Sequence, residues 1–290
     1  MNNSGKIISS NGTEMFTPPS NTLLPTRDAG KVPVLEVRGL GIDFGGLRAV
    51  DDFSITVGPT EISGLIGPNG AGKTTVFNLL TNVYKPTRGA ILLDGKSTAG
   101  KTVDQVNKMG IARTFQNIRL FNKMSVLDNV RVGLHNHTDS NFAQSFLRLP
   151  AHYKAERKST EKALELLSIF DMENEANTLA GNLPYGAQRR LEIIRALATS
   201  PKLLLLDEPA AGMNPSETAA LMESIRKIRD TFHIAILLIE HDMNLVMNVC
   251  EGIAVLNFGK IIAKGSPEQI KSNEAVIEAY LGHHDDEEEE

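Results

Sequence analysis

Short apolar runs of the strand type alternate along the chain with segments in which apolar residues recur at helical spacing. The runs Glu61–Ile66, Lys202–Leu206 and His233–Ile239 are strand candidates, and the last two are apolar on both faces. Such runs suit a parallel sheet that is covered by helices on both sides. The pattern therefore predicts an α/β fold, in which order begins at the short alternating strand Val34–Val37.

Helical spacing is clearest in two stretches. Between about residues 117 and 182 there are few strand-type runs, and Ala163, Leu167 and Phe170 fall on one helical face. This stretch is predicted to be a mostly helical insertion between parts of the α/β core. A second helix is expected to begin after Asn214, a capping residue that is followed directly by proline.

Both ends of the chain differ in composition from the middle. Residues 1–32 are rich in Ser, Asn, Thr, Pro and Gly without apolar periodicity, so we expect a mobile extension. Residues 283–290 form an acidic tail, most simply a solvated end. No apolar run is long enough to span a bilayer, and none near the start resembles a signal peptide. We therefore expect a soluble intracellular protein.

Charge and cysteine content narrow the class of partner. The formal net charge is −5, and Asp285–Glu290 carry six of the negative charges, so the rest of the chain is close to neutral. Without a basic excess, nucleic acid is not expected as a partner. The single cysteine, Cys250, excludes an intrachain disulfide and fits a reducing compartment.

A phosphate-binding loop follows the first apolar strand. The segment Gly67–Thr74 matches G-x-x-x-x-G-K-[ST] at every fixed position, and a helical pattern follows it. The glycines let successive backbone N–H groups point inward, where the helix N-terminus adds partial positive charge. Lys73 is expected to reach the β- and γ-phosphates, and the Thr74 hydroxyl to ligate Mg²⁺. The predicted nucleotide-binding residues of this segment are Gly67, Pro68, Asn69, Gly70, Ala71, Gly72, Lys73, Thr74 and Thr75.

An acidic pair ends the run of four leucines at 203–206. The run is suited to a central strand, which delivers Asp207 and Glu208 to the carboxyl edge of the sheet, where ligands of open α/β sheets bind. Asp207 is suited to hold Mg²⁺ through water. Glu208 is suited to polarise the attacking water.

The order of the motifs is more specific than any one of them. After the phosphate loop come Gln116 in Ala112–Asn117, the segment Leu183–Arg190, the acidic pair with the following loop, and His241. The series resembles the Walker A, Q-loop, signature, Walker B, D-loop and H-loop motifs of the ATP-binding subunits of ABC transporters. The resemblance covers roughly residues 34–282.

The resemblance narrows to one subfamily. The segments Leu183–Gly186, Pro209–Pro215 and Ile239–Met243 look like those of branched-chain amino acid importers, and most closely like the longer of their two ATPase subunits. This implies a P-loop NTPase of the ABC type, with a nucleotide-binding domain over residues 33–282. The implied domain has a mostly parallel sheet core, an antiparallel β subdomain and a helical subdomain at about 117–195.

By position, the resemblance assigns further roles. Phe44 would stack on the adenine of ATP. Gln116 would sense Mg²⁺ or the attacking water and couple to the permease, and His241 would contact the γ-phosphate. The implied catalytic residues are Glu208, His241, Gln116 and Lys73. The implied metal ligands are Thr74, Gln116 and Asp207.

The signature departs from the Leu-Ser-Gly-Gly-Gln that is usual in ABC proteins. Pro184 and Tyr185 replace the serine and the first glycine, and Ala187 stands where a polar residue is common. Gly186 and the N-terminus of the following helix can still supply donors. We expect a weakened contact with the γ-phosphate bound by the other subunit, and Tyr185 near the permease-facing surface. The implied signature residues are Leu183, Pro184, Tyr185, Gly186 and Ala187.

The resemblance implies an ATP-hydrolysing subunit, with ATP and Mg²⁺ as cofactors, that couples hydrolysis to uptake of branched-chain amino acids. The implied partners are a second ATPase subunit, identical or different, two transmembrane permease subunits and, indirectly, a periplasmic binding protein. The chain would then be peripheral at the cytoplasmic face of the inner membrane. Two alternatives are an ATPase of a urea or amide importer and a DNA-repair ATPase of the ABC type. The latter would need coiled-coil arms or DNA-binding domains, which the sequence does not indicate.

Overall fold

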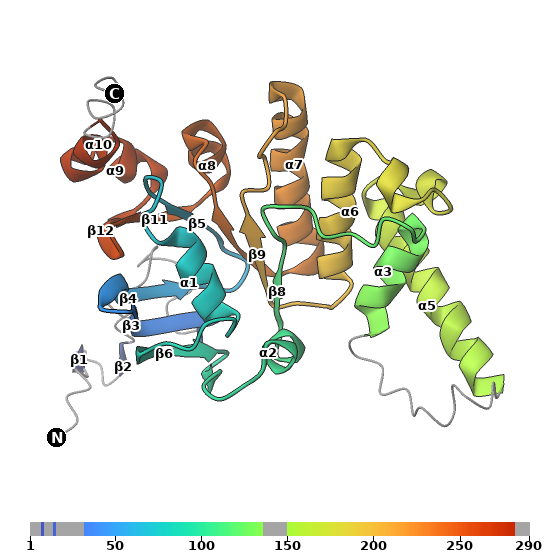
Figure 1. Cartoon of the computed structure of the whole chain (residues 1–290), viewed down its shortest axis with the longest axis horizontal. Helices are drawn as coiled ribbons and strands as arrows, with labels where there is room; N and C mark the ends of the chain where they lie inside the picture. Colours follow the sequence, from blue (N-terminus) through green and yellow to red (C-terminus); the bar gives the residue numbers. More distant parts are fainter. Residues whose placement is uncertain (1–6, 9–13, 16–31, 136–149, 282–290) are drawn as a thin grey trace.

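The main sheet is six-stranded, with the strand order β12-β11-β5-β10-β9-β8 (Figure 1). The computed structural model describes residues 7–8, 14–15, 32–135 and 150–281. The strands are β5 (Ile62–Ile66), β8 (Ile111–Arg113), β9 (Leu203–Asp207), β10 (Ala235–Ile239), β11 (Gly252–Asn257) and β12 (Lys260–Gly265). All neighbours are parallel except β11 and β12, which are antiparallel.

A second sheet is antiparallel, with the order β4-β3-β6-β7. Its strands are β3 (Leu35–Phe44), β4 (Leu47–Val57), β6 (Arg88–Leu93) and β7 (Lys96–Ser97). Within the predicted extension, β1 (Ile7–Ile8) pairs with β2 (Glu14–Met15). The rest of residues 1–31 and the tail 283–290 lie outside the described residues.

The leucine and isoleucine strands alternate between two hydrophobic cores. In β9, Leu204 and Leu206 belong to the first core, whereas Leu203 and Leu205 belong to the second. This is the expected result of a strand whose successive side chains point to opposite faces, both of them covered. The predicted α/β fold with a mostly parallel sheet is confirmed.

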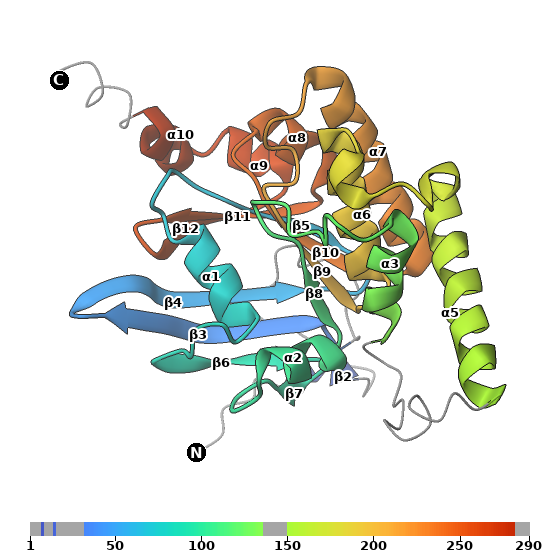
Figure 2. The same cartoon turned by 45° about the vertical axis from the view of Figure 1, so that its right-hand side comes forward.

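The helices divide between these two cores. Helix α1 belongs to the core between the two sheets, whereas α3, α5, α6, α7 and α8 supply the other core. Figure 2 shows α3, α5 and α6 together at one side of the molecule. The helices are α1 (Lys73–Leu80), α2 (Val103–Met109), α3 (Val126–Leu134), α5 (Pro150–Ile169), α6 (Tyr185–Leu197), α7 (Pro215–Phe232), α8 (Met243–Val249), α9 (Pro267–Lys271) and α10 (Glu274–Leu281), with 3-10 turns η2 (Glu173–Glu175) and η3 (Ala180–Asn182). In the described ranges, no helix combines the length and the apolar character that a membrane crossing needs.

Two boundaries illustrate how local chemistry sets the elements. Helix α7 begins as predicted: Asn214 accepts from the Glu217 amide, while the Glu217 side chain accepts from the Asn214 amide. The strand expected from His233 begins two residues later, at Ala235. His233 instead ends α7 in a left-handed conformation, with φ of 51°, so it cannot also start the strand.

Candidate nucleotide-binding and catalytic site

The phosphate loop lies between the end of β5 and the start of α1. Two of its glycines are required by geometry. A Cβ on Gly67 would lie 2.0 Å from the carbonyl oxygen of Leu256. Gly72 caps α1 with φ of 103°, a left-handed conformation that side chains disfavour. No side chain caps α1 and its first turn holds no acidic residue, so its N–H groups can bind an anion.

Lys73 is the first residue of α1 and lies folded over the loop. Its Nζ donates to the carbonyl oxygens of Gly67 at 2.6 Å and Pro68 at 2.9 Å. Burial lowers the pKa of Lys73, while the negative charges of Glu208 and Asp207 oppose that shift. The predicted lysine and the acidic pair therefore lie close enough for the carboxylates to affect the pKa of Lys73.

Asp207 ends β9 at the carboxyl edge of the main sheet, as the leucine run predicts. Its Oδ2 accepts from Nη2 of Arg113 at 2.6 Å, and both side chains are almost fully buried. The backbone N–H of Asp207 donates to the Thr114 hydroxyl at 3.3 Å. Arg113 also donates to Oδ1 of Asn78 in α1 at 2.7 Å. The predicted metal ligand therefore has a fixed orientation, held by a cation that sequence reasoning did not assign.

The residues predicted to hold Mg²⁺ fit that ion chemically. Thr74 is in the first turn of α1, Asp207 ends β9 at the carboxyl edge of the sheet, and Gln116 reaches the acidic pair from the loop after β8. Hydroxyl, carboxylate and amide oxygens are the ligand types that Mg²⁺ prefers.

Gln116 and Glu208 meet directly. Nε2 of Gln116 donates to Oε2 of Glu208 at 2.7 Å. Glu208 has φ of 45°, a conformation that costs energy for a residue other than glycine. Its backbone N–H donates to the carbonyl of Ile239 at 3.0 Å, which fixes the turn against β10. The orientation of the predicted base is thereby set by its backbone conformation and by its hydrogen bond with Gln116.

His241 follows β10 and its side chain is 62% exposed. The residue before it, Glu240, is fully buried. Oε1 of Glu240 accepts from the Ala210 amide at 2.8 Å, and Oε2 accepts from the His241 amide at 3.2 Å. One buried carboxylate thus joins the loop after Glu208 to the segment that carries His241.

The predicted signature opens α6. Pro184 is the N-cap, and no side chain caps the helix. The Tyr185 hydroxyl donates to the Ala211 carbonyl at 3.1 Å, and its ring lies beside Gly212. Tyr185 therefore packs on the loop after the acidic pair, and its expected place near a permease-facing surface stays a prediction. Gly212 has φ of 77°, a left-handed conformation that side chains disfavour.

Phe44, the predicted adenine platform, ends β3 at a hairpin. The residue is 44% exposed, and its ring meets that of Tyr84 edge-on, with the ring centroids 5.3 Å apart. An exposed aromatic face is suited to stack on a base.

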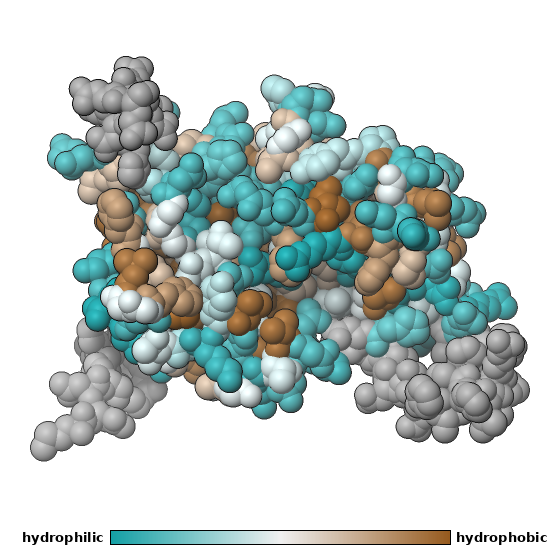
Figure 3. Space-filling model, viewed as in Figure 1, coloured by the Kyte–Doolittle hydropathy of each residue, from teal (hydrophilic) through white to brown (hydrophobic). Residues whose placement is uncertain are grey.

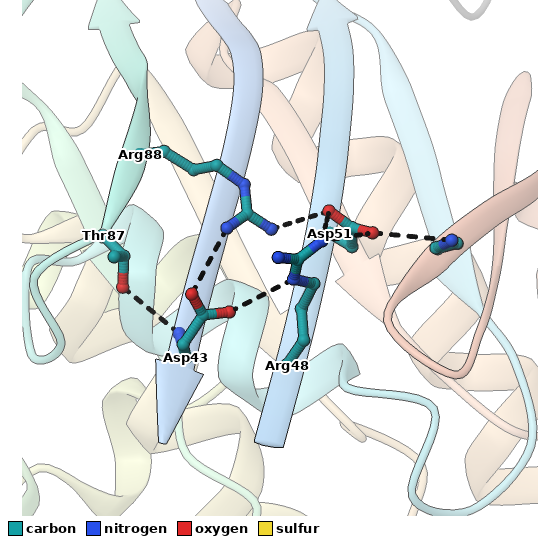
Figure 4. A network of polar contacts seen from close by, with 6 residues as sticks. Asp43, Arg48, Asp51, Thr87 and Arg88 are labelled. Atoms are coloured by element: carbon teal, nitrogen blue, oxygen red, sulfur yellow. Dashed lines mark hydrogen bonds and ion pairs between the residues drawn. The ribbon is translucent and has the colours of Figure 1, made fainter. Parts of the chain in front are cut away.

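A polar network crosses the strands of the same hairpin (Figure 4). Asp51 of β4 accepts from Arg88 of β6 at 2.6 Å, and Arg88 also meets Asp43 of β3 at 3.4 Å. Arg48 pairs with both aspartates at 3.4 Å. These contacts join the three strands beside Phe44.

Comparison with known proteins decides the family. The profile described as ABC transporter matches residues 50–211, and one described as branched-chain amino acid ATP-binding cassette transporter matches residues 260–286. The chain belongs to the ABC transporter family. Its α/β fold is that of an ABC-type ATPase domain, as the motif order predicts.

Relatives match this ABC ATPase over nearly their whole length. BraF of Pseudomonas aeruginosa and LivG of Escherichia coli K12 are high-affinity branched-chain amino acid transport ATP-binding proteins; each is 48% identical over 86% of this chain and 98% of its own. LptB of Haemophilus influenzae, from a lipopolysaccharide export system, is 32% identical over 86% of this chain and 97% of its own. The ADP conformation of MJ1267, an ATP-binding cassette of an ABC transporter, matches with a TM-score of 0.75 at 30% identity, over 86% of this chain and 99% of that one.

Sequence reasoning missed three side chains of this ABC site. Arg113 lies three residues before Gln116, and Glu240 lies directly before His241; a charged residue at the end of an apolar strand is the signal that could have found them. Tyr280 of α10 gave no such signal. Its hydroxyl is buried beside the Gly67 amide, and burial raises the pKa of Tyr280 to about 12 against the opposing effect of that amide. The C-terminal helix therefore reaches the phosphate loop.

The buried carboxyl of Glu240 predicts a pH dependence of stability. Burial raises the pKa of Glu240 above its ordinary value of 4.5, even though backbone amides oppose the shift. The folded state therefore holds this proton more tightly than the unfolded state. We expect this contribution to be fully present below pH 4.5 and to be lost as the pH rises through the folded pKa.

Urea unfolding of the wild type and Glu240→Gln at several pH values measures the effect. The wild type should lose stability relative to the variant as the pH rises from 4.5 toward neutrality. A difference that stays constant with pH would contradict the prediction.

Proposed function

We propose that this chain is the ATP-hydrolysing subunit of an importer of branched-chain amino acids. The observation that carries the proposal is the 48% identity to two branched-chain amino acid transport ATP-binding proteins along 98% of their length. The match at residues 260–286 supports it independently, because that segment lies outside the general ABC transporter match.

In the proposed cycle, ATP binds with its phosphates on residues 67–75 and its adenine on Phe44. Thr74, Asp207 and Gln116 hold Mg²⁺. Glu208 polarises the attacking water, Lys73 stabilises the charge that develops on the phosphates, and His241 contacts the γ-phosphate. Two observations support these assignments: the electrostatic interaction of Lys73 with Glu208 and Asp207, and the hydrogen bond between Gln116 and Glu208.

The proposed assembly contains two ATPase subunits, identical or different, beneath two permease subunits that a periplasmic binding protein supplies. The signature segment of each ATPase, here residues 183–187, closes the ATP site of the other. The chain is then peripheral at the cytoplasmic face of the inner membrane. We further propose a nucleotide-binding domain over residues 33–282, with a helical subdomain at about 117–195.

Uptake of labelled leucine, with urea in parallel, tests the function. Host cells carrying Lys73→Ala should lose leucine uptake and keep urea uptake. Loss of urea uptake alone would move the substrate to urea and overturn the branched-chain assignment. If the Lys73→Ala cells keep both leucine and urea uptake, the chain serves neither transport.

A hollow of about 370 Å³ between α2, β8, α3 and α6 is the proposed docking site for the permease. Phe121, 47% exposed, and Val132, 39% exposed, line it together with Arg195. Figure 3 shows hydrophobic side chains gathered over α3 among hydrophilic ones. The hollow also reaches Arg113, so a docked segment would lie close to the Asp207 ion pair.

Phe121→Ala tests the docking site. We expect leucine uptake to fall at least tenfold while the ATP affinity of the isolated chain stays the same, because the ring faces the hollow and not the phosphate loop. Leu164→Ala on α5, an apolar side chain 38% exposed, is the matched control and should keep uptake. Equal uptake by the two variants would exclude Phe121 from docking.

A further inference from the structure

A fully buried arginine connects the signature helix to the loop that follows β8. Arg189 of α6 has no exposed surface, and its guanidinium donates to two backbone carbonyls of that loop. Nη1 donates to the Phe115 carbonyl at 2.7 Å, and Nη2 donates to the Gln116 carbonyl at 2.8 Å. A planar guanidinium suits such a fork of two acceptors. The loop is therefore attached to α6 at the residue that carries the proposed Mg²⁺ and water sensor.

Glu192, one turn further along α6, completes the attachment. Its Oε2 pairs with Nη1 of Arg189 at 3.0 Å, and its Oε1 accepts from the Arg119 amide at 3.1 Å. The pair thus holds three backbone groups between residues 115 and 119. Because both side chains are buried, the charge of Arg189 is compensated inside the protein.

The same helix meets the acidic pair from the other side. Tyr185, at the start of α6, donates to the Ala211 carbonyl in the loop after Glu208. Gln116 has its backbone held by Arg189, while its side chain donates to Glu208 at 2.7 Å. Glu208 itself is fixed to β10, because its backbone N–H donates to the Ile239 carbonyl at 3.0 Å. A displacement of α6 would therefore move Gln116 relative to Glu208.

We propose that Arg189 and Glu192 form a positioning clamp that sets how Gln116 meets Glu208, and so sets the rate of ATP hydrolysis. The inference rests on the proposed roles of Gln116 and Glu208. The clamp touches neither nucleotide nor water itself. Its loss should therefore lower kcat and leave ATP affinity and the KM for ATP unchanged.

The double variant Arg189→Met/Glu192→Leu tests the clamp. Removing both partners avoids an unpaired buried charge, and such apolar replacements are often neutral for stability. We expect a thermal midpoint close to that of the wild type, a dissociation constant for ATP within twofold, and kcat lowered at least tenfold. Wild-type kcat in the folded double variant would overturn the proposal.

The surface pair Arg157–Glu161 of α5 offers a matched control, with N and O atoms 3.0 Å apart. Arg157→Met/Glu161→Leu should change neither kcat nor ATP affinity. If the clamp double variant fails to fold, Arg189→Lys tests the clamp instead, because lysine keeps the positive charge but cannot donate to both backbone carbonyls as the planar guanidinium does. It should lower kcat at unchanged ATP affinity, and wild-type kcat in that variant would overturn the clamp.

Glu208→Gln separates the clamp from the function on which it rests. Lost hydrolysis in Glu208→Gln together with normal kcat in the clamp variant means that the clamp alone is wrong. Normal hydrolysis in Glu208→Gln means that the assigned base is wrong, and the clamp as stated is wrong with it.

Discussion

Replacing Glu208 by Gln is expected to preserve ATP binding and to lower the rate of hydrolysis by about 10²–10⁴-fold, the usual contribution of a general base. The substitution keeps the shape of the side chain and removes its ability to take a proton. The Gln116 amide can still donate to the remaining carbonyl oxygen at the same place, since it donates to Oε2 of Glu208 at 2.7 Å. The loss should therefore appear in kcat and not in ATP affinity.

ATP affinity by calorimetry and phosphate release under saturating ATP measure the two quantities. We also expect ATP to trap the Glu208→Gln variant as a closed pair of subunits, because the γ-phosphate that holds the pair together is not removed. Light scattering with ATP then separates this pair from the single chain. Glu223→Gln, the same substitution at an exposed position of α7, is the control. Turnover as fast as that of this control would show that Glu208 is not the base.

The parts of the site that follow from local sequence were predictable. A glycine loop between an apolar strand and a helix fixes where Lys73 lies, and the leucine run that ends at Asp207 fixes which sheet edge the acidic pair occupies. Local rules suffice there because the strand and the helix position the side chains by themselves. The same holds for the start of α7, where Asn214 and Glu217 cap each other.

The contacts that join distant segments were not predictable in this way. Arg113 and Asp207 are far apart in the sequence, and they meet only because β8 pairs with β9 in the sheet. Tyr185 and Ala211 are likewise distant in the sequence, and the hydroxyl of the one meets the carbonyl of the other only in the folded chain. In both cases the partner is chosen by packing of elements, about which the spacing of residues along one segment says nothing.

Replacing Arg113 by Met should destabilise the ATP-free protein by about 3–5 kcal/mol, because it leaves the buried carboxylate of Asp207 without its cation. The N–O distance in this pair is 2.6 Å, and both side chains are less than a tenth exposed. Asn78 loses its donor from the same guanidinium. Adding Asp207→Asn should restore most of the stability, since it removes the charge that the first change left unpaired.

Urea unfolding of the single and double variants measures these energies. Arg157→Met is the control: Arg157 pairs with Glu161 at the surface, and its loss should cost no more than about 1 kcal/mol. An Arg113→Met protein as stable as this control would mean that Asp207 does not depend on Arg113 for charge compensation.

The Arg113→Met variant also tests the proposed Mg²⁺ ligand without measuring activity. If Asp207 holds the ion, Mg²⁺ with ATP supplies the positive charge that Arg113 no longer provides. The thermal midpoint should then rise more on adding Mg²⁺ and ATP than on adding ATP with a chelator, and this gain should be larger than in the wild type. Equal gains in the two proteins would remove Asp207 from the proposed metal site, since the ion would not be relieving its unpaired charge.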